Sequence, residues 1–119
     1  MVAALFIVGG LLFALRGTEN GAPANNVSIE GGVQVVEIRA KGGYQPRNSA
    51  AQAGVPTIVR FKTSGTFDCS SFVRFPSLNI TQNLSASGIT EIDVGTPAAG
   101  ALQGMCGMGM YRFQIDFQG

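Results

Sequence analysis

The sequence predicts an all-β fold, a Greek-key sandwich of about seven short antiparallel strands. Three observations lead to this prediction. Glycine supplies 17 of the 119 residues and proline another 5, so turn signals recur along the chain. Valine, isoleucine and phenylalanine, which favour strands, fill the segments between these turns. After Arg16, no window shows the periodicity of an amphipathic helix.

Residues 1–17 form an apolar N-terminal segment closed by Arg16, and we expect it to fold as a short helix. Its apolar part, residues 2–15, is shorter than the ~20 residues that a straight helix needs to cross a bilayer. No basic residue follows Met1, as one would in an export signal. Three interpretations stay open: an uncleaved membrane anchor, which we favour, a cleaved export signal, and a buried helix. An anchor would place the rest of the chain on the extracytoplasmic side of the membrane.

Residues 18–32 are rich in small and polar side chains and contain few large apolar ones, which is typical of a flexible linker. The folded domain is therefore expected at residues 33–119. The clearest strand signal lies after Pro56, where polar and apolar side chains alternate. The predicted strands span, in order, residues 33–39, 48–52, 55–62, 70–75, 90–94, 101–105 and 111–117.

The composition excludes several classes of function. A formal net charge of +1 provides no basic surface for nucleic acid, and no P-loop or Rossmann glycine pattern is present. The chain contains no histidine, so it cannot form a Ser-His-Asp or Cys-His catalytic pair. A blue-copper centre, which uses two histidines and a cysteine, cannot be built from this chain alone. We therefore expect a protein that is not an enzyme.

The most informative motif is Cys-Gly-Met-Gly-Met at residues 106–110, in which three sulfur side chains alternate with glycine. Thiolate and thioether are soft ligands, and they suit Cu(I) better than Zn²⁺, Ca²⁺ or Mg²⁺. The glycines allow the backbone to turn tightly, so that the three sulfur atoms can converge. Met105 has the opposite parity along an extended chain, and we expect it in the core instead. The motif predicts a Cu(I) site.

Cys69 is the second cysteine of the chain and leaves two interpretations open. Two cysteines in an exported domain usually pair, which would make Cys69 and Cys106 a structural disulfide. Met108 and Met110 favour the copper site, because methionines isolated between glycines are poor core filler. Arg74 and Arg112 flank the two halves of this site, and we expect them to be ordinary surface residues.

These residues resemble the cupredoxin-like Cu(I)-binding domains of membrane-anchored bacterial copper chaperones and of copper-exporting P-type ATPases. The resemblance covers residues 34–117, and its specific landmark is a cysteine followed later by Cys-x-Met-x-Met. It implies a cupredoxin fold that binds one or two Cu(I) ions. Its implied metal ligands are Cys69, Cys106, Met108 and Met110. The two thiolates would hold one copper tightly, and the methionines would help to hold a second, more labile one.

The chain departs from the pattern of this family at three positions. Gly104 stands where the family usually carries an aromatic residue, and Phe113 stands where glycine is usual. Ala101 replaces a common acidic residue. These changes lie in the expected strands and not among the implied ligands, so they concern local packing more than the choice of metal.

Two functions follow as expectations. The first is an extracytoplasmic, membrane-tethered Cu(I)-binding protein that buffers copper or transfers it to a membrane transporter or cuproenzyme. The alternative is an accessory cupredoxin-like subunit of a larger respiratory or photosynthetic membrane complex. In that case its role would be structural, and the two cysteines could be oxidised to a disulfide. A dinuclear electron-transfer centre shared between chains is disfavoured by the missing histidine.

Overall fold

The structure is a computed structural model that describes residues 26–119. The predicted N-terminal anchor, residues 1–17, lies outside the described residues, as does the predicted linker up to residue 25. Within residues 26–119, no helix is long and apolar enough to cross a membrane. This part of the chain contains ten strands and two short 3₁₀ turns: β1 Val27–Glu30, β2 Val33–Ala40, β3 Tyr44–Gln45, β4 Asn48–Gln52, β5 Thr57–Thr63, η1 Cys69–Ser71, β6 Phe72–Phe75, η2 Pro76–Leu78, β7 Ile80–Asn83, β8 Gly88–Gly95, β9 Gly100–Cys106 and β10 Arg112–Gln118.

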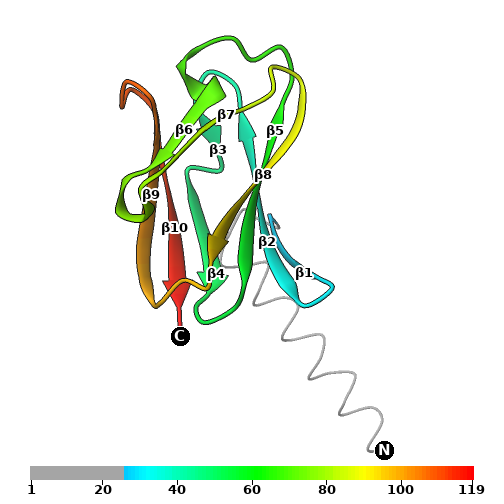
Figure 1. Cartoon of the computed structure of the whole chain (residues 1–119), viewed down its shortest axis with the longest axis vertical. Helices are drawn as coiled ribbons and strands as arrows, with labels where there is room; N and C mark the ends of the chain where they lie inside the picture. The colour runs from blue at the N-terminus through cyan, green and yellow to red at the C-terminus, as the bar shows by residue number, and fades with distance from the viewer. Residues whose placement is uncertain (1–25) are drawn as a thin grey trace, which may run out of the picture.

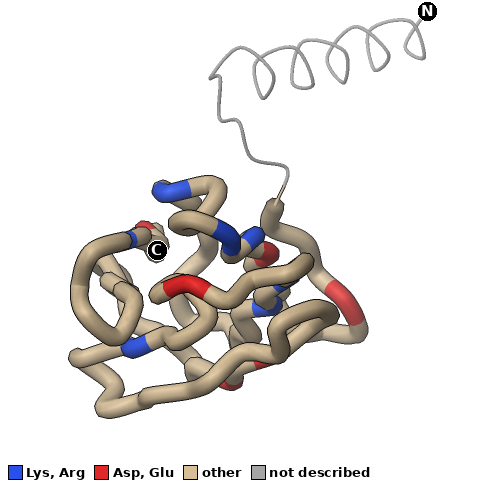
Figure 2. Tube along the Cα trace, turned by 90° about the horizontal axis from the view of Figure 1, so that it is seen from above, with Lys and Arg blue, Asp and Glu red and all other residues tan. Residues whose placement is uncertain are grey.

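The strands form two five-stranded sheets that face each other as a sandwich (Figure 1). The first sheet has the order β1-β2-β5-β8, with the short β3 paired to β2. The second has the order β4-β10-β9-β6-β7. Charged positions of both signs are interspersed over the domain (Figure 2). The predicted all-β sandwich is therefore confirmed for the described residues.

The prediction of purely antiparallel pairing is wrong, because each sheet contains one parallel pair. Strand β2 runs parallel to β5, and β4 runs parallel to β10. The reason is the crossing of the chain between sheets. After β2 the chain passes to the second sheet as β4 and returns to the first as β5, and such a crossover brings β5 back in the direction of β2.

The sequence analysis missed three strands: it predicted about seven, whereas the described residues form ten. β3 has only two residues, Tyr44–Gln45, and β7 has only one large apolar residue, Ile80. β1 lies within residues 18–32, so the predicted linker extends too far. Gly31 and Gly32, with φ of 59° and 84°, form the tight hairpin that joins β1 to β2.

Aromatic side chains fill the middle of the sandwich around Phe113. Its ring centroid lies 4.7 Å from that of Tyr44, 5.7 Å from that of Phe61 and 5.6 Å from that of Phe75. All three contacts are edge-to-face, the arrangement that aromatic quadrupoles favour. These four rings come from both sheets, so they connect the two layers.

The packing explains why Gly104 and Phe113 both differ from the related pattern. The two residues are direct partners across β9 and β10. A Cβ atom built at Gly104 would collide with the ring of Phe113, which already occupies the space beside the glycine. In this chain the volume beside Gly104 is filled by the ring of Phe113 from the neighbouring strand, so the two positions share one packing space.

Candidate metal centre

Cys69 is positioned by a short 3₁₀ turn at one end of the sandwich. It opens η1, and Asp68 caps this turn by accepting a hydrogen bond from the backbone N–H of Ser70 at 3.0 Å. The second carboxylate oxygen of Asp68 accepts the backbone N–H of Gly42 at 2.7 Å. One carboxylate therefore fixes the Cys69 turn and fastens it to the loop after β2.

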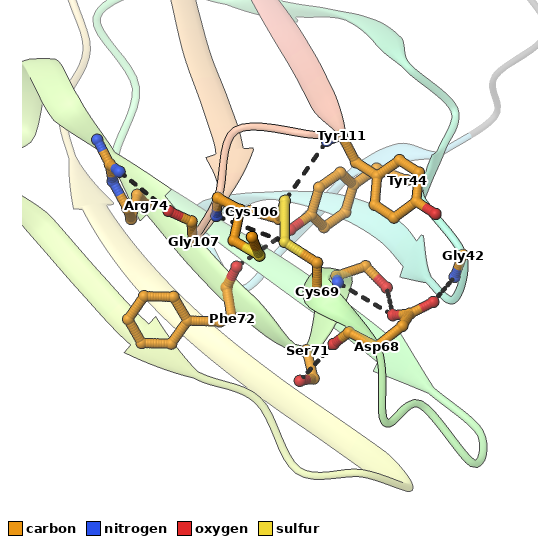
Figure 3. The surroundings of a disulfide bond; sticks show 12 residues. Gly42, Tyr44, Asp68, Cys69, Ser71, Phe72, Arg74, Cys106, Gly107 and Tyr111 are labelled. Atoms are coloured by element: carbon orange, nitrogen blue, oxygen red, sulfur yellow. Dashed lines mark hydrogen bonds between the residues drawn. A yellow bond between two sulfur atoms is a disulfide. The ribbon is translucent and has the colours of Figure 1, made fainter.

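Cys106 is the last residue of β9 and is fully buried. Its strand pairs with β6, which follows the Cys69 turn directly, so the sheet itself brings the two cysteines together. Their Cα atoms are 5.6 Å apart, and the two sulfur atoms form a disulfide (Figure 3). Cys69 and Cys106, predicted as a pair of ligands or as a disulfide, are thus neighbours in space.

The methionines lie on the loop between β9 and β10. A backbone hydrogen bond of 2.9 Å from Gly109 N–H to Cys106 O closes this loop, and Gly109 has a positive φ of 72°. The backbone N–H of Met108 approaches Sγ of Cys69 at 3.5 Å, so the loop folds back over the cysteines. Met108 and Met110 are 81 % and 65 % exposed. The structure therefore places both methionines at the end of the domain that carries the cysteines, with their thioethers open to solvent.

Both cysteine sulfurs accept backbone hydrogen bonds. Met108 N–H donates to Sγ of Cys69, and Tyr111 N–H donates to Sγ of Cys106 at 3.4 Å. These two hydrogen bonds connect both sulfur atoms to the backbone of the loop between β9 and β10.

Three further residues shape the loop and were not assigned a role from the sequence. Phe72 packs on Gly107, where an added Cβ would lie 2.6 Å from Cδ2 of Phe72, so any larger residue would force the Phe72 ring to shift. Arg74 donates from its guanidinium to the carbonyl of Gly107 at 3.2 Å. Tyr44 is buried, and its hydroxyl donates to the carbonyl of Phe72 at 3.3 Å. No short sequence motif indicates the roles of these three residues. The one local signal near the cysteines is the helix-capping pattern Asp-x-Ser at residues 68–70.

Two titratable groups near the cysteines have shifted pKa values. Hydrogen bonds from Ser70, and then from the backbone of Gly42, hold the pKa of Asp68 below its usual value despite an opposing effect of burial. Burial raises the pKa of Tyr44, and the nearby charge of Asp68 adds to this effect. Around the cysteines, Asp68 is therefore anionic and Tyr44 is neutral at physiological pH.

The donor set at this end of the domain is sulfur. Within residues 26–119, no group of three or more Cys, Asp and Glu residues is arranged to hold a metal ion. The disulfide must be reduced before it can bind a metal, because the thiolate is the ligand. Once reduced, Cys69 and Cys106 offer two soft donors, carried on Cα atoms that lie 5.6 Å apart. Met108 and Met110 would supply neutral thioethers beside them, and this set fits Cu(I).

Solved structures of other proteins have a fold similar to that of this chain. The metal-binding domain of the Cu(I)-exporting P-type ATPase CopA of Streptococcus pneumoniae D39, in a crystal structure with Cu(I), shares 24 % identity and a TM-score of 0.71; the match covers 78 % of this chain and 93 % of that one. A copper binding protein solved in its apo form by NMR shares 22 % identity and a TM-score of 0.71, over 77 % of this chain and 94 % of that one. Auracyanin B is more distant, at 14 % identity and a TM-score of 0.50, over 81 % of this chain and 96 % of that one.

No curated protein sequence matches the chain significantly. Residues 5–115, which cover most of the sequence, match the cupredoxin-like domain family. The sandwich of mixed sheets and its similarity to the copper-binding domains agree with this match. The chain therefore belongs to the cupredoxin-like domain family.

Proposed function

We propose that this domain binds Cu(I) through Cys69, Cys106, Met108 and Met110 when its cysteines are reduced. The observation that carries the proposal is the meeting of the two cysteines, from distant parts of the chain, beneath a loop that carries two exposed methionines. Two of the structural neighbours are a Cu(I)-bound domain and a copper binding protein, which supports the same metal. One or two ions would be bound.

The difference in burial between the ligands suits transfer of copper. Cys106 is fully buried, so a copper held by the thiolates would be shielded from solvent. Met108 and Met110 are exposed, and a neutral thioether surrenders its metal more readily than a thiolate. Copper would pass between the exposed and the buried ligands by exchange. The domain would buffer copper or deliver it, without catalysing a chemical conversion.

The apolar N-terminal sequence supports a proposal for the cellular location of the domain. We propose that residues 1–17 tether the domain to a membrane and that the domain lies on the extracytoplasmic side. Its partner would then be a membrane copper transporter or a cuproenzyme. Extracting the protein from isolated membranes with carbonate and with detergent tests the tether, since an anchored chain is released by detergent alone.

Titration of the reduced full-length chain with Cu(I), against a competing chelator and without oxygen, tests copper binding. The variant Cys69→Ser/Cys106→Ser is expected to lose tight binding, by more than the ~10–100-fold that changes outside the ligand shell cause. Met108→Leu/Met110→Leu should retain the tight site and weaken the second one. Met105→Leu is the matched control, because Met105 lies on β9 with its side chain half-buried. Unchanged affinity in the double cysteine variant would refute the proposal.

The disulfide favours a second candidate function. A permanent Cys69–Cys106 bond would leave no thiolate for copper, and the domain would then serve as a structural subunit of a larger membrane complex. Thiols counted on protein isolated without reductant, from cells lysed in a thiol-alkylating reagent, distinguish the two. Two alkylated cysteines support copper binding. A full disulfide, together with copurification in a large detergent-solubilised assembly, supports the subunit.

A further inference from the structure

We propose that a pocket beside Met110 recognises the carboxylate groups of a small anionic thiol that carries Cu(I). This inference rests on the proposed copper function and adds the chemical class of the copper donor. The pocket has a volume of about 320 Å³ and is lined by Gly43, Gln45, Arg47, Met110, Tyr111 and Arg112, among others. A predicted copper ligand and two arginines thus share one concave surface.

The two arginines have no carboxylate partner in the described part of the chain. The ion pairs among residues 26–119 all involve Arg60 or Lys62, on the outer face of the other sheet. Arg47 and Arg112 also line a second pocket of about 170 Å³, so both residues contribute to two pockets. An unpaired pair of guanidinium groups is a suitable receptor for carboxylate, which arginine can bind with two parallel hydrogen bonds.

One carboxylate, that of Asp68, contacts a residue of the pocket wall and is already engaged. Asp68 contacts Gly42, which also lines the pocket, but its oxygens accept hydrogen bonds from Gly42 and Ser70. These contacts hold its pKa low and its side chain at the Cys69 turn. Asp68 therefore does not form an ion pair with Arg47 or Arg112.

The backbone beneath the pocket is held in place by pairing. Arg112 begins β10, where it is the partner of Met105 on β9. The carbonyl of Arg47 accepts a hydrogen bond of 2.8 Å from Gln114 N–H, so the segment before β4 is fixed to the same strand. Both arginines therefore project from anchored backbone, which lowers the entropy lost when they bind a ligand. Tyr111 packs on Gly43, whose φ of 125° is disfavoured for other residues, and closes one wall.

The chemistry is an exchange of thiol ligands without a redox step. The carrier enters as a Cu(I)–thiolate complex with its carboxylates on Arg47 and Arg112, and the exposed thioether of Met110 contacts the copper first. Bonds then form from Cu(I) to the thiolates of Cys69 and Cys106, and the bond to the carrier sulfur breaks. The two protein thiols lose two protons: one is taken up by the departing carrier thiolate, and the other is released to solvent. Copper remains monovalent throughout.

Comparison of two carriers with the same thiol tests the inference. The probes are Cu(I)–glutathione, whose carboxylates are ionised, and Cu(I) bound to glutathione diethyl ester, in which they are blocked. Both are mixed with the reduced full-length chain without oxygen, and the rate of copper transfer is followed by ultraviolet absorption. We expect transfer from the anionic carrier to be at least ~10-fold faster at low ionic strength, and this ratio to fall as salt is added.

Two double variants distinguish an effect of the pocket on the transfer rate from an effect of the protein's net charge. Arg47→Gln/Arg112→Gln is expected to bring the ratio of the two rates close to one, while its equilibrium Cu(I) affinity, measured with a competing chelator, stays unchanged. Arg60→Gln/Lys62→Gln removes the same charge from the outer face of the first sheet, and should keep the ratio of the unmodified protein. Equal rates for the two carriers in the unmodified protein, or equal loss of preference in both double variants, would overturn the inference.

A copper-free measurement keeps this inference separate from the proposed function. S-methylglutathione has the carboxylates of the carrier and no free thiol, so it does not depend on copper binding. At millimolar concentration it should shift the guanidinium NMR signals of Arg47 and Arg112 and leave those of Arg60 in place. Absence of these shifts would refute the pocket even if the domain binds copper. Failure of the Cu(I) titration with the shifts present would refute the copper function and leave the anion pocket established.

Discussion

Exchanging Gly104 and Phe113 should show that the two positions share one packing volume. In the structure, the ring of Phe113 occupies the space into which a side chain at position 104 would project. The perturbation is a double-mutant cycle of Gly104→Phe, Phe113→Ala and the combined variant, which carries its aromatic ring on β9 instead of β10.

The magnitudes follow from the packing. Phe113 is 3 % exposed and meets three aromatic rings, so its truncation to alanine should cost about 4 kcal/mol of unfolding free energy. Gly104→Phe forces a second ring into filled space and should cost about 2 kcal/mol. If the positions were independent, the combined variant would lose about 6 kcal/mol. Because its new ring enters the vacated volume, we expect it to lose about 3 kcal/mol.

Urea denaturation followed by circular dichroism measures these differences, with the disulfide intact in every variant. The expected result is an interaction energy of about 3 kcal/mol between the two substitutions. Costs that add to within about 0.5 kcal/mol would refute the reasoning, because they would mean that the two residues do not compete for one space. Gly104→Ala is the milder control, since even one Cβ at position 104 meets the Phe113 ring.

Two further predictions concern the cysteine end of the domain. The disulfide closes a loop with a sequence separation of 37, so a phosphine reductant should lower the unfolding free energy by about 4 kcal/mol. Saturating Cu(I) should restore about 3 kcal/mol of this at a hundredfold excess over its dissociation constant; no recovery in urea denaturation would contradict copper binding to the native state. Asp68→Ala removes the cap of η1 and should cost about 1 kcal/mol, whereas Asp68→Asn keeps a capping oxygen and removes only the charge. Because the folded pKa of Asp68 is lowered, its stabilisation is complete above the usual value of 3.8 and is lost as the pH falls through the lower folded value, so Asp68→Asn should flatten the acid limb of the stability profile; an unchanged acid limb would contradict this assignment.

The sequence predicted the strands that have one buried face. Strand β5 alternates between buried and partly exposed residues, and its predicted range, 55–62, overlaps the observed Thr57–Thr63. β1 and β7 were missed because each has only four residues, lies at a sheet edge and is mostly exposed. Residues 27–30 do alternate in polarity, but over too short a stretch to indicate a strand, and β7 has one large apolar residue, Ile80. Parallel pairing was also missed, since it depends on which sheet each segment joins and not on any local pattern.

The candidate site, like the fold, was predictable from the sequence only in part. Cys69 and Cys106 were identified by residue type, and the structure brings them together. The roles of Phe72 and Arg74 were not predictable, because both residues act through Gly107, far along the chain. The pocket at Arg47 and Arg112 was likewise hidden, since it exists only once β10 is paired with the segment before β4. Sequence reveals donor chemistry, whereas the supporting contacts depend on tertiary pairing.

The parallel alignment of β4 with β10 has a consequence for the speed at which the domain assembles. Asn48 pairs with Gln114, so the second sheet cannot close until two distant parts of the polypeptide have found each other. Topologies dominated by such non-local contacts typically need milliseconds to seconds to fold. During that interval both thiols are accessible to oxidants and stray metals. Oxidation of the two cysteines to a disulfide therefore competes with any metal binding while the domain is still folding.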